Sequence, residues 1–338
     1  MLVLLLCGNA AAWWWAMAEG RHEPLFLGSC LLAYGFGLRH AFDADHIAAI
    51  DNVTRSLARD MGAPVTVGLW FALGHSTVVV SACALVALMV GQPQAWLPRL
   101  VAWGSLGGSL FSVLFLCAAA GINAASLPAM LCAWRRGSSC NAAQSGPRGL
   151  LAAAVGAVTQ LVSRPWHMLL VGLLFGLGFD TASEVGLLGL SASTALHMPS
   201  QASIMILPVL FTVGMSLADA SDGAIMARAY SWATELPQRR LTYNLVVTSL
   251  SVLAAVIVAA VELGDLVRQK FSLRGMVWRF IAWTCDHSEL VGVLIFTTLL
   301  GSWLVVLLGR LATLPSVVSH DVSADRLSPY VNPYSDEG

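Results

Sequence analysis

The residues most able to do chemistry stand together in one short segment, Leu38–Ile47. It contains two imidazoles, two carboxylates and a guanidinium, which belong to His40, His46, Asp43, Asp45 and Arg39. The segment lies in an apolar stretch long enough to cross a bilayer, where an ionisable group costs free energy unless it is paired or bound. Histidine and carboxylate together suit a borderline divalent transition metal. The sequence therefore predicts a metal-ion site inside a membrane.

The spacing of these residues predicts different roles for them if the segment is a straight helix. At about 100° per residue, His40, Asp43 and His46 fall within an arc of roughly 120° and can face one ion. Asp45 falls about 100° from His46 on that geometry and would orient an imidazole from a neighbouring helix. A helix broken at this point is the alternative, which two glycines just upstream permit. A third interpretation is a buried network that only locks helices together.

Further ionisable side chains lie well inside other apolar stretches. His75 is open to two interpretations, a metal ligand or a histidine that packs helices. Asp180 and Glu184 are four residues apart, and Asp219 and Asp222 three apart, so each pair faces one way. Like-charged carboxylates on one face require a proton or a cation, and hydrogen bonding to an unwound backbone is the alternative. We predict that these four, with Arg39, line a translocation path.

The composition is that of a membrane protein. Of the 338 residues, 57% are hydrophobic and only 11% are charged, whereas soluble domains contain about 25% charged residues. The net charge of -1 gives no signal of nucleic-acid binding. The seven cysteines include no CxxC pair and are interpreted as small apolar side chains. The lipid bilayer is therefore the expected partner.

The apolar runs predict an all-α, polytopic membrane bundle of about eight transmembrane helices in one domain, residues 1–315. The short apolar segment Leu150–Val162 is expected at the interface or packed against the bundle, with a ninth span as the alternative. Residues 316–338 are polar and are expected to form a disordered tail. The expected spans are Leu2–Ala18, Leu25–Ile50, Val65–Val90, Leu100–Ala120, Trp166–Leu190, Ile204–Ala227, Leu241–Val261 and Leu290–Gly309.

Basic residues predict how the bundle is oriented. If the N-terminus is cytoplasmic, the inside segments carry about twice as many arginines and lysines as the outside loops. Both termini are therefore expected in the cytoplasm. The loop after the seventh span does not fit this orientation, because it would lie outside and yet contains Arg268, Lys270, Arg274 and Arg279.

Two short similarities relate the halves of the chain. Phe42–Ala44 in span two resembles Phe179–Thr181 in span five, and Gly74–Ser76 in span three resembles Gly214–Ser216 in span six. Spans two and five are three crossings apart and should run in opposite directions. This pattern predicts an inverted repeat with the site between its halves near the midplane, although a ninth span would make the repeat parallel.

Four motifs in order resemble the nickel/cobalt transporter family. The segment Arg39–Asn52 carries a His-x4-Asp-His pattern at His40, Asp45 and His46, and three further motifs occupy 73–79, 177–184 and 214–223. The resemblance runs from about Leu25 to Gly309. It implies an eight-helix, ATP-independent permease that takes up Ni²⁺ or Co²⁺ across the cytoplasmic membrane, with the span-two residues as its main determinants of binding and selectivity.

The sequence departs mildly from the motifs of that family. Ser183 stands where threonine is expected, and Ala220-Ser221 replaces a threonine-containing pair. These differences leave the expected fold intact but weaken any inference about which of the two metals is preferred.

Uptake driven by the membrane potential is the expected activity. A divalent cation gains about 4.6 kcal/mol per 100 mV on moving to the negative side. The chain has no P-loop and only one lysine, Lys270, so it does not hydrolyse ATP by that route, and neither an ATPase subunit nor a cofactor is implied. The alternative is efflux by proton exchange, although Arg135–Gly149 contains no histidine to gather metal.

A membrane enzyme is the competing class of function. His40 and Asp45 also fit the H-x4-D spacing of membrane acyltransferases. That chemistry requires a histidine at the interface beside a substrate groove, whereas this pair lies deep within a span. No H-E-x-x-H pattern is present either. The sequence therefore predicts a transporter and not an enzyme, and leaves its oligomeric state open.

Overall fold

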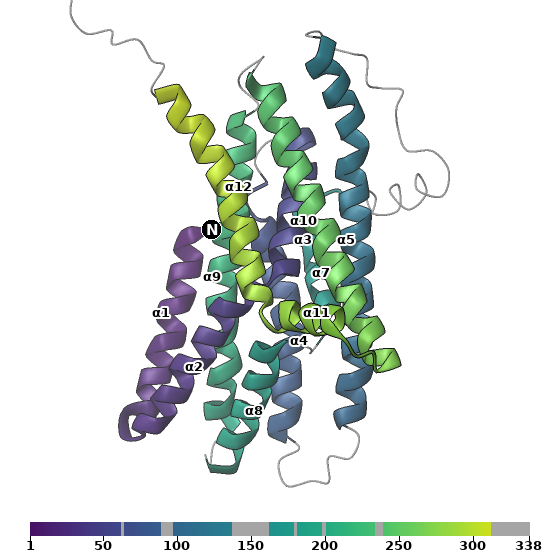
Figure 1. The fold of residues 1–338 in the computed structure, drawn as a ribbon. Coiled ribbons are helices and arrows are strands. Elements are labelled where there is room, and N and C mark those ends of the chain that lie inside the picture. The colour runs from purple at the N-terminus through teal and green to yellow at the C-terminus, as the bar shows by residue number, and fades with distance from the viewer. Residues whose placement is uncertain are drawn as a thin grey trace, which may run out of the picture.

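The computed structural model describes residues 1–61, 64–88, 97–136, 162–178, 181–197, 201–233 and 239–311. Within these ranges the chain is helical and contains no strand, and most helices run alongside one another as a bundle (Figure 1). The elements are α1 Leu2–Glu19, η1 Gly20–His22, α2 Pro24–His40, α3 Ala44–Met61, α4 Val67–Leu88, α5 Leu97–Arg136, η3 Pro165–His167, α7 Met168–Phe175, α8 Ala182–His197, α9 Gln201–Ala233, α10 Arg239–Phe271, α11 Met276–Asp286 and α12 Ser288–Leu311.

Six described helices, α1, α4, α5, α9, α10 and α12, are long and apolar enough to cross a membrane. The pair α2 and α3 passes the same test but is bent by 50° at a short break, which makes up to seven spans. The prediction of an all-α, multi-pass membrane bundle is confirmed. The expected fifth span is not one helix, because α7 ends at Phe175 and α8 begins at Ala182.

Two of the expected spans are thus interrupted, and the first interruption falls at one of the two similar tripeptides. Phe42–Ala44 contains the break between α2 and α3, whereas α7 ends at Phe175, before the second tripeptide, of which only Thr181 is described. The inverted repeat itself stays a prediction. Of the segment Leu150–Val162 only Val162 is described, and residues 316–338 also lie outside the described residues.

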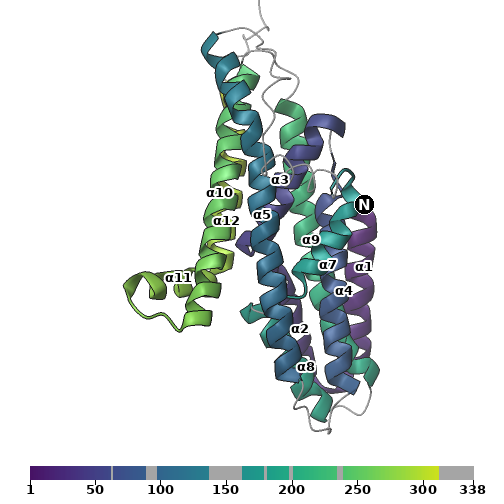
Figure 2. The same ribbon diagram turned by 90° about the vertical axis from the view of Figure 1, so that its right-hand side faces the viewer.

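Helix α4 packs against both α9 and α7 (Figure 2). Gly68 lies against α9 so closely that a Cβ atom there would collide with the backbone carbonyl of Asp219. On the other side of α4, a Cβ atom on Gly172 of α7 would collide with the carbonyl of Phe71. Glycine permits such backbone contact between membrane helices. These contacts fix α4 relative to the two helices beside it.

A buried polar cluster joins α3, α9 and α10. Arg55 donates hydrogen bonds to the hydroxyl of Tyr230 at 2.5 Å and to Ser251 at 3.1 Å, and its guanidinium lies 4.0 Å from the centre of the Tyr230 ring. Tyr230 also donates a hydrogen bond to Asp51, whose carboxylate lies 3.7 Å from Arg55. All four side chains are buried. The cluster ties together segments that are far apart in the sequence.

Candidate metal centre

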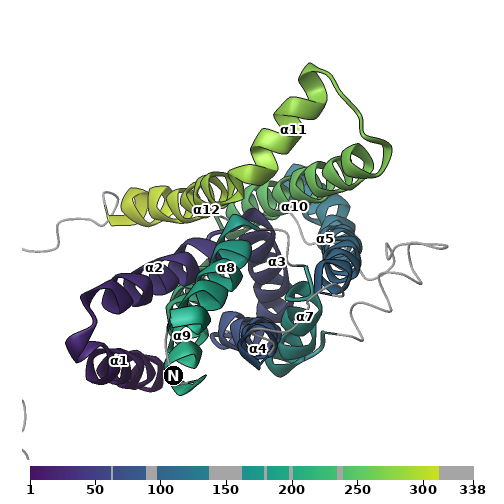
Figure 3. The same cartoon turned by 90° about the horizontal axis from the view of Figure 1, so that it is seen from below.

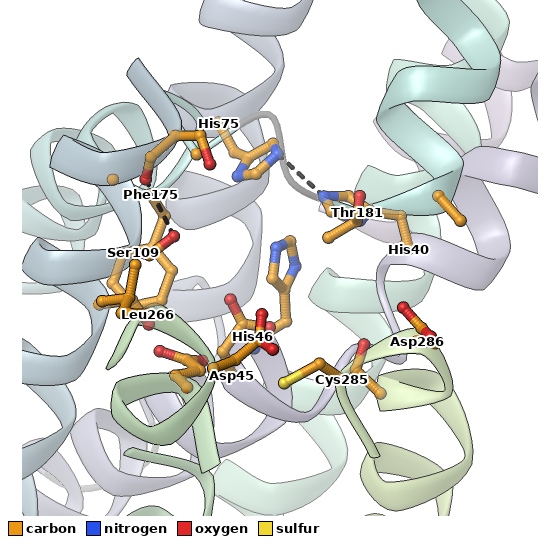
Figure 4. Close-up of a pocket in the computed structure, with 18 of the residues that line it drawn as sticks. His40, Asp45, His46, His75, Ser109, Phe175, Thr181, Leu266, Cys285 and Asp286 are labelled. Carbon is orange, nitrogen blue, oxygen red and sulfur yellow. Dashed lines mark hydrogen bonds between the residues drawn. The ribbon is translucent and has the colours of Figure 1, made fainter. Parts of the chain in front are cut away.

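Three histidines from three helices converge in the core of the bundle (Figure 4). His40 ends α2, His46 lies in the first turn of α3, and His75 is in the middle of α4. Each offers a ring nitrogen within 4.8 Å of the other two, and all three are buried. The ring centroids are 4.6, 4.8 and 4.9 Å apart. They form a nearly equilateral triangle of imidazoles, a good ligand set for a borderline divalent ion.

The break between α2 and α3 allows the first two histidines to meet. The backbone closes a tight turn there, with N–H groups of Phe42 and Asp43 bonded to the carbonyls of Arg39 and His40 at 3.0 and 2.9 Å. Bonds between residues three apart are typical of a helix that tightens as it ends. The straight helix through the motif is therefore wrong, and the broken helix is what the structure shows.

The break also changes the positions of the two aspartates. Asp43 lies behind His40, with Oδ2 2.7 Å from Nδ1, and its other oxygen accepts a hydrogen bond from Ser288 of α12 at 2.8 Å. This contact fixes the ring and leaves its Nε2 facing the centre. Asp45 accepts the backbone N–H of His46 at 2.9 Å. Asp43 thus orients an imidazole, which is the role that a straight helix gave to Asp45.

Glu184, in the first turn of α8, brings a carboxylate to the same point. Its Oε1 lies 3.0 Å from Nε2 of His75 and 3.7 Å from Nε2 of His40, and these two nitrogens are 2.9 Å apart. Thr181 donates a hydrogen bond to the other Glu184 oxygen at 3.1 Å. Three electron-rich ligand atoms at such distances require a shared proton or a cation between them.

Two aspartates of α9 extend the polar core. Asp219 lies 3.6 Å from Nδ1 of His46, and Asp222 follows one turn later. Both side chains are buried, and neither carboxylate makes a hydrogen bond with any described residue. Nδ1 of His46 likewise makes no hydrogen bond with any described residue. Buried polar atoms that make no hydrogen bond are costly, so a proton or a cation would stabilise this part of the core.

Comparison with known proteins identifies the family of the chain. Residues 26–308 match the family model described as "High-affinity nickel-transport protein". The chain belongs to this family. It is 42% identical to the "High-affinity nickel transport protein" of Cupriavidus necator over 90% of this chain and 89% of that protein. It is also 38% identical to the "Nickel transporter NixA" of Staphylococcus aureus over 90% of each chain.

A further relative is named for the second metal. The chain is 44% identical to the "Cobalt transport protein NhlF" of Rhodococcus rhodochrous over 69% of each chain. No solved structure matches this transporter. Membership of a permease family also decides between a transporter and a membrane enzyme. The H-x4-D pair here belongs to a transporter and not to an acyltransferase.

The histidines of the transporter line one end of a cavity of about 280 Å³. In Figure 4, His75 lies at one end and Asp45, Cys285 and Asp286 lie at the other. Asp286 is exposed, whereas the three histidines are buried, so the cavity leads inward from the side of α11. Its outer wall also contains Glu262, Asp265 and Ser288. The wall is therefore rich in carboxylates.

Not every predicted site residue lies in this centre. Arg39 forms an ion pair with Glu289 of α12 at 2.8 Å, and its side chain is 38% exposed. Its ion-pair partner is thus Glu289 and not a described carboxylate of α8 or α9. Asp180 lies outside the described residues. The structure brings His40, Asp43, His46, His75 and Glu184 into direct contact, and places Asp219 beside His46.

The cavity wall includes acidic residues that sequence reasoning did not single out. Glu262, Asp265 and Asp286 lie at or beyond the ends of expected spans, where charges are ordinary. Their signal was weak for that reason. The three acids flank one loop in the sequence, and one of them, Asp265, is paired with Arg268 at 2.6 Å.

Proposed function

We propose that this protein is a permease that takes up Ni²⁺ and Co²⁺ across the cytoplasmic membrane and binds them at the three-histidine cluster. The observation that carries the proposal is the meeting of His40, His46 and His75, whose ligand atoms lie within 4.8 Å of one another in a buried site. Imidazole favours nickel and cobalt over magnesium or calcium. Relatives named for nickel and for cobalt support both metals as substrates.

The residues around the cluster fit a transported cation. Nε2 of His40, Nε2 of His75 and Oε1 of Glu184 already face one point, and the cation would replace the proton that they must otherwise share. Asp43 holds His40 in the orientation that leaves this nitrogen free for the ion. Asp219 and Asp222 offer carboxylate oxygens further along α9. Oxygen ligands bind these metals less firmly than imidazole, so they suit release.

The proposed direction is inward. Figure 1 shows that the first residues of α1 and the last residues of α12 point toward the same end of the bundle, away from α11. With both termini in the cytoplasm, as the basic residues predict, the cavity faces the outside. Its carboxylates raise the local concentration of cations, and an inside-negative potential contributes about 4.6 kcal/mol per 100 mV.

Uptake of radiolabelled nickel and cobalt by cells that express the chain tests this function. We expect saturable uptake of both metals, each competed by the other. His40→Ala, His46→Ala and His75→Ala should each abolish high-affinity uptake at unchanged abundance in the membrane, because too few strong ligands remain. Wild-type affinity and rate in all three variants would rule out the site. Metal that leaves preloaded cells faster when the chain is expressed would support efflux instead.

A further inference from the structure

Helix α11 differs from the other described helices in its direction. It follows α10 after a short turn, and it projects sideways from the bundle before the chain enters α12 (Figures 2 and 3). The whole of α11 is described, and none of its residues is buried. A helix so placed must have some other surface to cover its apolar side chains.

The outward face of α11 is apolar and aromatic. Met276, Phe280 and Trp283 are spaced four and three residues apart and share one face of the helix. Their exposed fractions are 79%, 64% and 52%. The opposite face contacts the bundle, since Ile281 lies against Gly264 of α10 and Cys285 lines the cavity. The helix thus has one side for the protein and one large apolar side with no cover from the described chain.

The neighbouring surfaces indicate what covers it. Helices α10 and α12 are both long and apolar enough to cross the membrane, and α11 connects them directly. Leu263 of α10 and Leu294 of α12 are large apolar residues with 46% and 64% of their surface exposed. Such residues on spanning helices face lipid. The apolar face of α11 lies between these two lipid-facing helices along the chain.

Charge around α11 completes the pattern. The segment contains Arg268, Lys270, Arg274 and Arg279. Arg268 is paired with Asp265 at 2.6 Å, whereas the other three are exposed and form no ion pair with a described residue. Aromatic and basic side chains together are typical of helices that lie in the interface of a membrane. Lipid phosphates are the groups that would balance these three charges.

We propose that α11 is an interfacial helix that binds the membrane surface, with Met276, Phe280 and Trp283 in the acyl boundary and Lys270, Arg274 and Arg279 on the phosphates of anionic lipids. This explains why the loop after the seventh span is basic although it is expected outside, because its cations bind lipid. It also has a consequence that rests on the proposed function. Cys285 and Asp286 of the same helix line the metal cavity, so the lipid contact holds the mouth of the cavity in place.

Photo-crosslinking of the full-length protein in vesicles of phosphatidylcholine and phosphatidylglycerol tests the contact. Phe280→p-benzoylphenylalanine and Trp283→p-benzoylphenylalanine should both form adducts with the mass of a lipid. Leu294→p-benzoylphenylalanine on α12 is the positive control for lipid contact. Ile281→p-benzoylphenylalanine is the matched control on the other face, and it should crosslink to α10 within the same chain, which also reports that α11 is correctly assembled.

A second comparison tests whether the basic residues bind anionic lipid phosphates. The ratio of phosphatidylglycerol adducts to phosphatidylcholine adducts should fall about fivefold for each basic residue removed in Arg274→Gln and Arg279→Gln, since each contributes about 1 kcal/mol near a charged surface. An unchanged ratio would overturn this half of the proposal.

Two outcomes at the apolar face would overturn the other half. A covalent dimer at Phe280 and Trp283 would show that a second copy of the chain covers the face. An absence of lipid adducts at both positions, with adducts present at Leu294, would show that α11 stands away from the membrane. Neither readout involves metal transport, so failure here is distinct from failure of the proposed function.

Discussion

At the scale of single residues, the contact between Asp43 and His40 gives the sharpest expectation. Asp43→Asn should lower metal affinity about tenfold to hundredfold, because the carboxylate that orients the ring becomes a neutral amide. Asp45→Asn should cost less, since the amide oxygen can still accept the backbone N–H of His46. Isothermal titration of the purified variants with Ni²⁺ measures both. A larger loss in Asp45→Asn would show that Asp45 contacts the ion itself.

Asp222 supports a second expectation at this scale. Its carboxylate is buried and makes no hydrogen bond with a described residue, one turn beyond the aspartate that faces His46. Asp222→Asn should therefore lower the maximal rate of uptake while equilibrium binding of Ni²⁺ stays near that of the wild type. A loss of protein from the membrane would instead indicate a structural role. Unchanged transport would place the path of the ion elsewhere.

At the scale of elements, the glycine contacts of α4 set how closely α4 approaches α7 and α9. Gly68→Ala and Gly172→Ala should each destabilise the protein by about 1–3 kcal/mol, because the added methyl group has no room against a neighbouring backbone. Thermal melting in detergent measures the effect. Gly107→Ala on α5 is the matched control, since a Cβ atom there meets no described atom within 4 Å. Equal melting temperatures in all three variants would contradict the close approach.

Most of the elements could be predicted from the sequence, but the breaks within them could not. Hydropathy averages over many residues and does not detect a turn as short as Ala41–Asp43. The straight helix predicted there gave Asp43 and Asp45 the wrong positions, although the residues that it assigned to the site do lie in or beside it. Helix α11 was missed for a different reason. Its basic residues marked the segment as an outside loop, and its apolar residues were too few for a span.

At the scale of the whole molecule, the cluster around Arg55 joins distant parts of the chain. Arg55→Gln leaves Asp51 buried without its cation, and breaking a buried pair in this way costs about 3–5 kcal/mol. We expect a lower melting temperature and a reduced amount of protein in the membrane. Ser249→Ala is a suitable control on α10, because Ser249 is exposed and bonds only within its own helix. A normal melting temperature in Arg55→Gln would show that the cluster contributes little to stability.

The candidate site was predictable to the extent that intramembrane charge is rare. His40, His46, His75 and Glu184 stood out because each lies deep in an apolar stretch, and the structure brings them together. Arg39 stood out for the same reason, but its pairing with Glu289 depends on how α2 and α12 approach, which no local pattern reveals. In the acidic cavity wall, Glu262 and Asp265 lie on α10 and Asp286 ends α11, and only the tertiary fold places them beside the histidines.

The bend between α2 and α3 has a mechanical consequence. His40 and His46 lie on opposite sides of this bend, so any change of angle between the two helices would change the distance between their imidazoles. An ion that bridges both rings must therefore stiffen this joint, and by reciprocity a force that opens the joint must weaken the chelate. Metal binding and the angle between α2 and α3 are in this sense coupled. If the proposed ion bridges His40 and His46, bending between α2 and α3 changes how firmly the ion is held.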